Sequence, residues 1–306
     1  MGDGVQTGTR SGTWLVLLAA ICWGTTGTAQ AFAPEGATPL AVGAARLAVG
    51  GVALLGWAFF RRSFRQGGTW PLGATLVAAA CMAAYQLCFF AAVDRTGVAA
   101  GTVVAIGSAP VIAGILGWLV RREAPGWSWA MATALAVAGC VLLGVRGGSV
   151  TVDLAGILLA VGAGGSYALY VLASKGLVAV QRPEAAMGVV FVLGALLLTP
   201  LFFLQDFGWL VEPRGLLVVL HLGLVTTALA YALFAEALTT TPVAIAVTLT
   251  LGEPLTASLL GVLVLRESLS GQAMAGVTLL LAGLVVLAIS ARHTAQSTTA
   301  VEQAAS

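Results

Sequence analysis

The sequence is a succession of long apolar runs separated by short polar connections. A run of roughly 20 apolar residues can cross the hydrocarbon core of a bilayer as a helix. Charged residues make up only 8% of the chain, whereas about 25% is usual for a soluble domain. We therefore predict an all-α integral membrane protein with ten transmembrane helices. They are expected at residues 13–33, 39–60, 71–93, 97–120, 126–145, 154–174, 185–204, 215–238, 242–264 and 271–291.

The second half of the chain repeats the first half at a constant offset of 144 residues. At this offset Pro110 meets Pro254, and the dipeptide Arg122-Glu123 meets the dipeptide Arg266-Glu267. Charged pairs are rare in this chain, so a charged match in the same frame as the prolines indicates a tandem duplication. The predicted segments are a polar tail at 1–12, a first repeat at 13–147, a second repeat at 148–291 and a polar tail at 292–306.

Each repeat contains five of the predicted helices. Because five is an odd number of crossings, the second repeat starts on the opposite side of the membrane, and the two repeats are expected to be inverted. Inverted repeats are a common design of secondary transporters, in which the substrate site lies near the membrane midplane between the repeats. The duplication therefore predicts a transporter with a central site.

The distribution of lysine and arginine predicts the orientation in the membrane. With the N-terminus inside, nine of these residues fall on the cytoplasmic side and four on the opposite side. Both termini are therefore expected in the cytoplasm, in a multi-pass protein of the cell (inner) membrane. Lys175, at the end of the sixth predicted helix, is interpreted as one of the residues that anchor this orientation.

Glu253 is the leading candidate for a functional residue. It lies eleven residues after Pro242, which at about 1.5 Å per residue is half of a roughly 30 Å core. A charged side chain at that depth costs about 2.5–3.5 kcal/mol. Pro254 is expected to kink this helix and to free the carbonyl of Thr250, and Pro110 is expected to kink the fourth helix. We predict that Thr250 and Glu253 contact substrate and that Glu253 couples transport to protons; the alternative is a protonated glutamate that joins helices.

Two other charged residues lie within predicted helices. Arg46 is inside the second helix and Glu236 is close to the end of the eighth. A role in gating or ion pairing is considered for both. The alternatives are that Arg46 extends toward the membrane surface and that Glu236 reaches water.

Six aromatic residues lie well inside predicted helices, away from the interfacial belts where tryptophan and tyrosine usually gather. A tyrosine in such a position needs a partner for its hydroxyl, so it is expected to face protein or a cavity. They are predicted to line the substrate cavity, with ordinary helix packing as the alternative. The six are Trp23, Tyr85, Phe89, Tyr167, Tyr170 and Tyr231.

The repeated segments resemble a known family. The first repeat carries Ala109-Pro110-Val111 before Arg122-Glu123, and the second carries Leu251-Gly252-Glu253-Pro254 before Arg266-Glu267. Over about 13–290, the chain is similar to the ten-helix branch of the drug/metabolite transporter superfamily, which is built from two EamA repeats. The resemblance implies alternating access, a central cavity and export of a small metabolite or an amino acid.

Several other functions have no support in the sequence. We find no phosphate-binding G-x-x-x-x-G-K-[ST] motif, so a proton or ion gradient is the expected energy source. The two histidines and four cysteines have no metal-ligand spacing, and neither a metal site nor a cofactor is predicted. No basic strip indicates nucleic acid. The expected partners are a small-molecule substrate and the lipid bilayer, for a monomer or a homodimer.

Two alternatives to a secondary transporter remain open. A passive facilitator or channel for a small solute would have the same composition. An intramembrane lipid-modifying enzyme would need clustered aspartate, histidine or arginine at the helix ends, and the sequence offers no such cluster. The chain is therefore not expected to be an enzyme.

Overall fold

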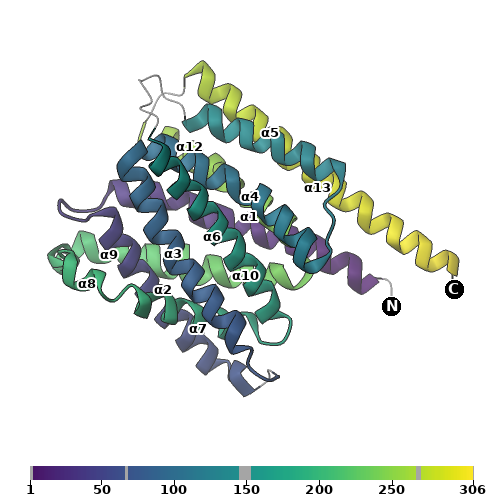
Figure 1. Cartoon of the computed structure of the whole chain (residues 1–306), viewed down its shortest axis with the longest axis horizontal. Helices are drawn as coiled ribbons and strands as arrows, with labels where there is room; N and C mark the ends of the chain where they lie inside the picture. Colours follow the sequence, from purple (N-terminus) through teal and green to yellow (C-terminus); the bar gives the residue numbers. More distant parts are fainter. Residues whose placement is uncertain (1–2, 66–67, 145–152, 267–269, 306) are drawn as a thin grey trace.

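The computed structural model describes residues 3–65, 68–144, 153–266 and 270–305, and all the regular structure within them is helical (Figure 1). The helices are α1 (Asp3–Ala31), α2 (Pro39–Phe60), η1 (Ser63–Arg65), α3 (Leu72–Thr96), α4 (Val98–Arg121), α5 (Trp127–Gly144), α6 (Leu154–Val178), α7 (Pro183–Leu197), α8 (Leu201–Leu204), η2 (Gly208–Val211), α9 (Pro213–Gly223), η3 (Leu224–Leu229), α10 (Ala230–Thr240), α11 (Val243–Leu249), α12 (Gly252–Leu263) and α13 (Gly271–Ala305).

These elements form ten long units, as predicted. The eighth unit consists of α9, the π-helical stretch η3 and α10, and the ninth consists of α11 and α12. Among the described residues, eight units are long and apolar enough to cross a membrane, while Trp127–Leu143 and Pro183–Leu197 are shorter apolar helices. The predicted all-α membrane fold is confirmed. The first and tenth helices extend into the predicted polar tails, because α1 begins at Asp3 and α13 ends at Ala305.

The seventh helix is shorter than predicted. We expected one helix over 185–204, but α7 ends at Leu197 and the short α8 follows from Leu201. Pro200 lies between the two elements and has no N–H to continue the helix. The carbonyl of Leu196 instead accepts the N–H of Thr199 at 3.1 Å, in a turn.

The ninth helix is interrupted in its middle. It was predicted as one helix over 242–264, but α11 ends at Leu249 and α12 begins at Gly252. The prediction of a free Thr250 carbonyl was wrong, because the backbone N–H of Glu253 donates to it at 2.9 Å. One tight turn therefore replaces the bond that Pro254 cannot make.

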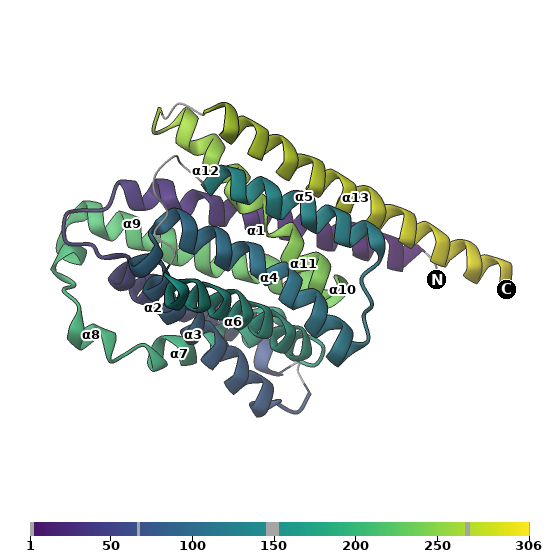
Figure 2. The same cartoon turned by 45° about the horizontal axis from the view of Figure 1, so that its top comes forward.

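The contacts between α5 and α13 show that the repeats are inverted. The two helices lie side by side along one edge of the bundle and run in opposite directions (Figures 1 and 2). A Cβ on Gly139 would lie 2.7 Å from the backbone nitrogen of Leu280, and a Cβ on Gly283 would lie 2.8 Å from that of Ala136. At the 144-residue offset Gly139 corresponds to Gly283 and Leu280 corresponds to Ala136, so the two contacts are equivalent. A two-fold axis in the membrane plane requires this equivalence.

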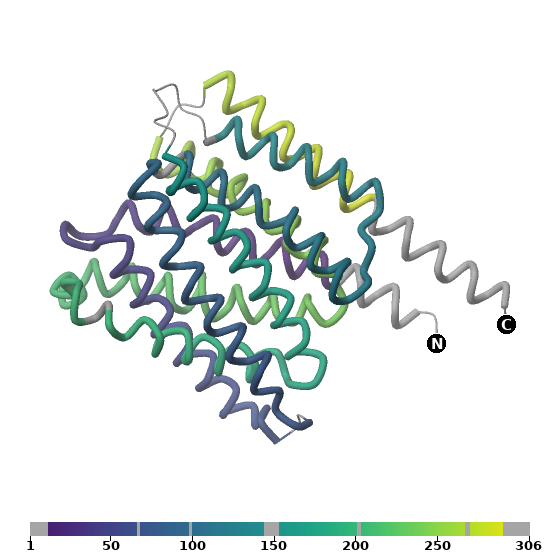
Figure 3. The backbone as a smooth tube through the Cα atoms, in the orientation of Figure 1, coloured from purple at the N-terminus to yellow at the C-terminus, as the bar shows by residue number. Residues whose placement is uncertain are grey.

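The same exchange relates the rest of the bundle. The third of the ten helices packs against the sixth, and its repeat counterpart, the eighth, packs against the first. In the same way the fourth packs against the sixth, and its counterpart, the ninth, packs against the first. The second and seventh helices pack together at the edge opposite α5 and α13 (Figure 3). The two halves therefore interlock, and residues from both halves meet in the middle of the bundle.

Candidate functional site

The predicted aromatic residues meet in the interior of the bundle. Starting at α1, the ring of Trp23 lies 4.9 Å from that of Tyr231 on α10, and Tyr231 lies 6.0 Å from Tyr170 on α6. Tyr170 lies 5.9 Å from Tyr167, which lies 5.8 Å from Tyr85 on α3. Phe89 stacks on Tyr85 at 5.8 Å. All six residues thus form one continuous series of ring contacts, which we call the aromatic cluster.

Sequence reasoning missed two further members of the aromatic cluster. Phe191 of α7 lies 4.4 Å from Tyr231, and Phe234 of α10 lies 5.4 Å from Trp23; both side chains are fully buried. The repeat could have pointed to Phe234. Its counterpart at the 144-residue offset is Phe90, which also contacts the aromatic cluster, because its ring lies 5.5 Å from that of Phe89.

Part of the aromatic cluster remains accessible. Trp23, Tyr170 and Tyr231 are buried, whereas Tyr85, Phe89 and Tyr167 are half-buried. The Tyr170 hydroxyl donates to the sulfur of Met187 at 3.2 Å. The indole N–H of Trp23 is buried and has no hydrogen-bond partner among the described residues. An unsatisfied buried donor in a native structure points to a site that water or a ligand completes.

Two charged residues, Arg46 and Glu253, come from helices that pack against those of the aromatic cluster. Arg46 comes from α2 and Glu253 from α12, and both side chains are half-buried. Within the described part of the chain, neither side chain makes a direct ion pair. The bundle thus holds a guanidinium on α2 and a carboxyl group on α12 that are not ion-paired within the described residues.

Close packing of α1 and α12 fixes the position of Glu253. A Cβ on Gly24 would lie 2.9 Å from the backbone oxygen of Glu253 and 2.4 Å from the Cβ of Thr256. Only glycine allows this approach, as at other helix contacts in membranes. Because Gly24 follows Trp23, the approach brings the Glu253 backbone next to the Trp23 end of the aromatic cluster.

The other predicted site residues have more ordinary surroundings. Glu236 is exposed on α10 and has no ion pair within the described ranges. The Thr250 hydroxyl, just after the end of α11, donates to the carbonyl of Val247 in that helix at 2.7 Å. Helix α4 continues through Pro110, whereas the ninth helix is interrupted just before Pro254.

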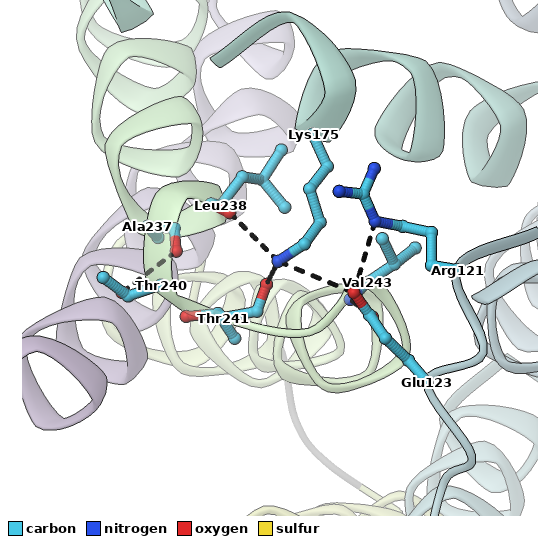
Figure 4. A network of polar contacts seen from close by, with 8 residues as sticks. All are labelled: Arg121, Glu123, Lys175, Ala237, Leu238, Thr240, Thr241 and Val243. Atoms are coloured by element: carbon cyan, nitrogen blue, oxygen red, sulfur yellow. Dashed lines mark hydrogen bonds and ion pairs between the residues drawn. The ribbon is translucent and has the colours of Figure 1, made fainter. Parts of the chain in front are cut away.

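A polar network joins the two halves at one end of the bundle (Figure 4). Lys175 of α6 donates to the carbonyls of Thr241 and Leu238, at 2.6 and 3.2 Å. Its Nζ also lies 3.9 Å from the Glu123 carboxylate, which pairs with Arg121 at 3.3 Å and accepts the backbone N–H of Val243 at 3.1 Å. We call these contacts the Lys175 network; the topology role assigned to Lys175 from the sequence overlooked them.

Helix ends explain why the Lys175 network forms there. The last carbonyls of a helix lack partners and attract cations, and the first N–H groups attract anions. Lys175 meets the end of α10, while Glu123 meets the start of α11. Arg122 directs Glu123 toward this junction by ending α4 in the left-handed region, with φ of 56°. Arg266 has the same φ of 56° at the matching position of the second repeat.

Replacing Lys175 by methionine should loosen this end of the bundle. A hydrogen bond to a charged group contributes about 1.5–3 kcal/mol, so hydrogen exchange at the amide of Val243 should accelerate about tenfold or more. Exchange of the purified protein followed by mass spectrometry would measure this.

The matched control for this experiment is Arg95→Met. Arg95 forms an exposed ion pair with Asp153 at 3.3 Å, and such pairs contribute little to stability. Equal exchange in the Lys175→Met variant and in the control would show that the Lys175 network does not hold this end closed.

Comparisons with known proteins give a consistent result. The sequence matches the profile of the EamA-like transporter family at residues 10–145 and again at 154–289. It is 51% identical over 278 residues to the uncharacterized transporter YwfM of Bacillus subtilis (strain 168), covering 90% of this chain and 93% of that protein. A solved crystal structure with 20% sequence identity has the same fold, with a TM-score of 0.81 over 93% of this chain and 99% of the other.

Proposed function

Because the chain belongs to the EamA-like transporter family, we propose that it is a secondary carrier that moves a small metabolite or an amino acid across the cytoplasmic membrane by alternating access. It is a multi-pass membrane transporter and not an enzyme. Export is the direction that the family resemblance favours. The excess of lysine and arginine on one side supports cytoplasmic termini, and this would place the Lys175 network on the cytoplasmic side.

The observation that carries this proposal is an aromatic cluster built from both halves, with the Lys175 network at one end. Trp23 and Tyr85 come from the first half, and Tyr167, Tyr170 and Tyr231 come from the second. A movement of one half against the other would therefore change the shape of the site, as alternating access requires. Substrate would bind against the exposed faces of the aromatic cluster.

The interruption of the ninth helix supports a hinge between α11 and α12. Helix α11 packs chiefly against α4 and also contacts α1, α5, α6 and α13, whereas α12 packs chiefly against α1 and also contacts α13. The indole of Trp129 donates to Thr248 at 3.0 Å and so attaches α11 to α5. The turn at Thr250 and Leu251 thus joins two segments whose principal neighbours differ, which supports a hinge at this turn.

Glu253 is the residue we propose for coupling to protons. It is a carboxylate in the middle of a predicted membrane span, and its position follows the turn between α11 and α12. Intramembrane carboxylates of this kind commonly serve in proton pathways.

Counterflow in proteoliposomes tests for a carrier. Vesicles loaded with unlabelled L-phenylalanine, 2-phenylethylamine or 3-phenylpropionate would receive the same compound in labelled form outside. A carrier should accumulate label faster from loaded vesicles than from empty ones for at least one compound. Flux that is unaffected by the internal compound would indicate a passive facilitator, and an absence of flux for all three would contradict a transport site at the aromatic cluster.

A further inference from the structure

We propose that the end of α2 binds an anionic phospholipid, whose acyl chain lies in a hollow on the outer face of the helix and whose phosphate meets the arginines that follow. This inference goes beyond the proposed carrier function and is independent of the substrate. The hollow has a volume of about 510 Å³ and is lined by Ala53, Gly56, Trp57, Phe60 and Arg61. We call it the α2 hollow, and we call Arg61, Arg62 and Arg65 the arginine group.

The α2 hollow faces away from the bundle. Its residues are spaced by three and four along the chain, so they share one face of the helix. The opposite face is closely packed, because a Cβ on Gly51 would lie 2.9 Å from the backbone nitrogen of Val192 in α7. On the outer face, a Cβ on Gly56 would meet no atom within 4 Å, and Phe60 is 89% exposed. An exposed apolar surface of this kind, at the last turns of a membrane helix, is available to lipid.

Aromatic residues place the end of α2 at the edge of the membrane. The rings of Phe59 and Phe64 lie 5.0 Å apart, and Phe64 stacks on Trp70 at 5.8 Å. Aromatic residues gather in this way where a helix reaches the lipid headgroups, and this part of the chain forms a corner of the bundle (Figures 1 and 3). From Ala53 to Arg61 the helix rises about 12 Å. An acyl chain that starts at the headgroups would therefore run along the α2 hollow.

The arginine group has no acidic partners. All three side chains are exposed, and within the described ranges none of them has an ion pair or a side-chain hydrogen bond. A guanidinium binds phosphate oxygens in a bidentate geometry. Basic residues directly after a membrane helix also attract anionic lipids, by about fivefold for each residue. The charge of the arginine group is therefore complementary to a lipid phosphate that adjoins the α2 hollow.

The connection that carries the arginine group is held in place by its neighbours. The hydroxyl of Ser63 donates to the carboxylate of Glu184 at 2.5 Å, and the side chain of Gln181 donates to the carbonyl of Gly68 at 2.8 Å. Glu184 also lies 3.8 Å from Arg182 and pairs with it, and not with the arginine group. A site that is fixed before binding loses less freedom when a ligand arrives.

The second repeat has neither part of this site. At the 144-residue offset, Gly56 corresponds to Pro200, and α7 ends at Leu197 before that position. The residues that correspond to the arginine group are Gln205, Asp206 and Trp209. One copy of the fold is thus built without the α2 hollow and without the arginine group. A binding role accounts for their presence in the other copy.

The charges favour a lipid over a second copy of this chain. Two copies with the same orientation in the membrane, if they met through this face of α2, would bring their arginine groups to the same depth. Like charges that face each other across an interface are unfavourable. A lipid phosphate neutralises the same charges and leaves its acyl chain to fill the α2 hollow.

Quenching of Trp57 by brominated lipids tests the inference on the full-length protein in nanodiscs. Phosphatidylglycerol or phosphatidylcholine with the same brominated chains would be added in increasing amounts to unlabelled phosphatidylcholine. The signal of Trp57 is obtained by subtracting that of the Trp57→Phe variant. We expect half-maximal quenching by phosphatidylglycerol at an about ten- to a hundredfold lower mole fraction than by phosphatidylcholine.

Trp127 is the matched control for this measurement. It is 83% exposed at the start of α5, and the charge distribution predicts it on the same side of the membrane as Trp57. Both lipids should quench it equally. Equal quenching of Trp57 by the two lipids would overturn the proposal. Protection of Trp57 from both lipids would also overturn it and would indicate that a second copy covers this face.

Two variants test the two parts of the site separately. Gly56→Leu fills the α2 hollow at a position where a Cβ meets no atom, so the protein should fold but lose the preference for phosphatidylglycerol. Arg61→Met should lower the preference about fivefold. Arg214→Met removes one charge from an exposed position of α9 and should leave the preference unchanged. A preference that survives Gly56→Leu, or that Arg214→Met lowers as much as Arg61→Met does, would contradict a specific site.

Discussion

Replacing Gly139 by valine should destabilise the protein by about 1–3 kcal/mol, the cost of overpacking a tight contact. A Cβ at this position would lie 2.7 Å from both the backbone oxygen of Gly276 and the backbone nitrogen of Leu280. Backbone atoms cannot move aside as a flexible side chain can, so α5 and α13 must separate. Thermal unfolding in detergent, followed by tryptophan fluorescence, would measure the loss.

The two-fold relation between the repeats predicts a matching loss of stability for the counterpart glycine. Gly283→Val should cause a loss of similar size, because a Cβ there would lie 2.6 Å from the backbone oxygen of Ala132. Gly56→Val is the matched control, since a Cβ at Gly56 meets no atom within 4 Å. A midpoint for Gly139→Val that equals the midpoint of the control would refute the close approach of α5 and α13.

Glu253→Gln should abolish the pH dependence of transport. A glutamine keeps the size of the side chain but can neither release a proton nor carry a negative charge. We expect the counterflow rate of the carried compound to become flat across the pH range in which the unmodified protein changes.

Glu236→Gln is the control for this experiment, because Glu236 is an exposed glutamate of the second repeat. It should leave the rate and the pH profile unchanged. Comparing thermal unfolding of the two variants separates a transport defect from a folding defect. A Glu253→Gln protein that transports at the normal rate at every pH would eliminate Glu253 as the coupling residue.

The sequence was most informative where one local property determines the outcome. Apolar length alone predicted ten helices, and the 144-residue offset predicted their inverted arrangement, which the contacts of Gly139 and Gly283 show. Depth within a helix predicted that Trp23, Tyr85, Tyr167, Tyr170 and Tyr231 contact protein, and their rings do contact one another. Their role in lining a substrate cavity stays a prediction.

Contacts between helices that are distant in sequence were not predictable in this way. Lys175 meets Glu123 and the end of α10 only because α4, α6 and α10 converge at one end of the bundle. Hydropathy carries no information on that convergence. The turn at Thr250 was also missed, because Pro254 indicates an interrupted helix but not which neighbouring bond replaces the lost one.

The Lys175 network has a thermodynamic consequence for the transport cycle. At the matching position of the first repeat the chain has Ala31, so the opposite end of the bundle has no equivalent lysine. Two inverted copies alone would give the two access states similar free energies. One charged hydrogen bond of about 1.5–3 kcal/mol, present in only one state, would make that state about ten- to a hundredfold more populated. A single side chain would then determine which face the unloaded protein presents most of the time, and Lys175→Met should bring the two populations closer together.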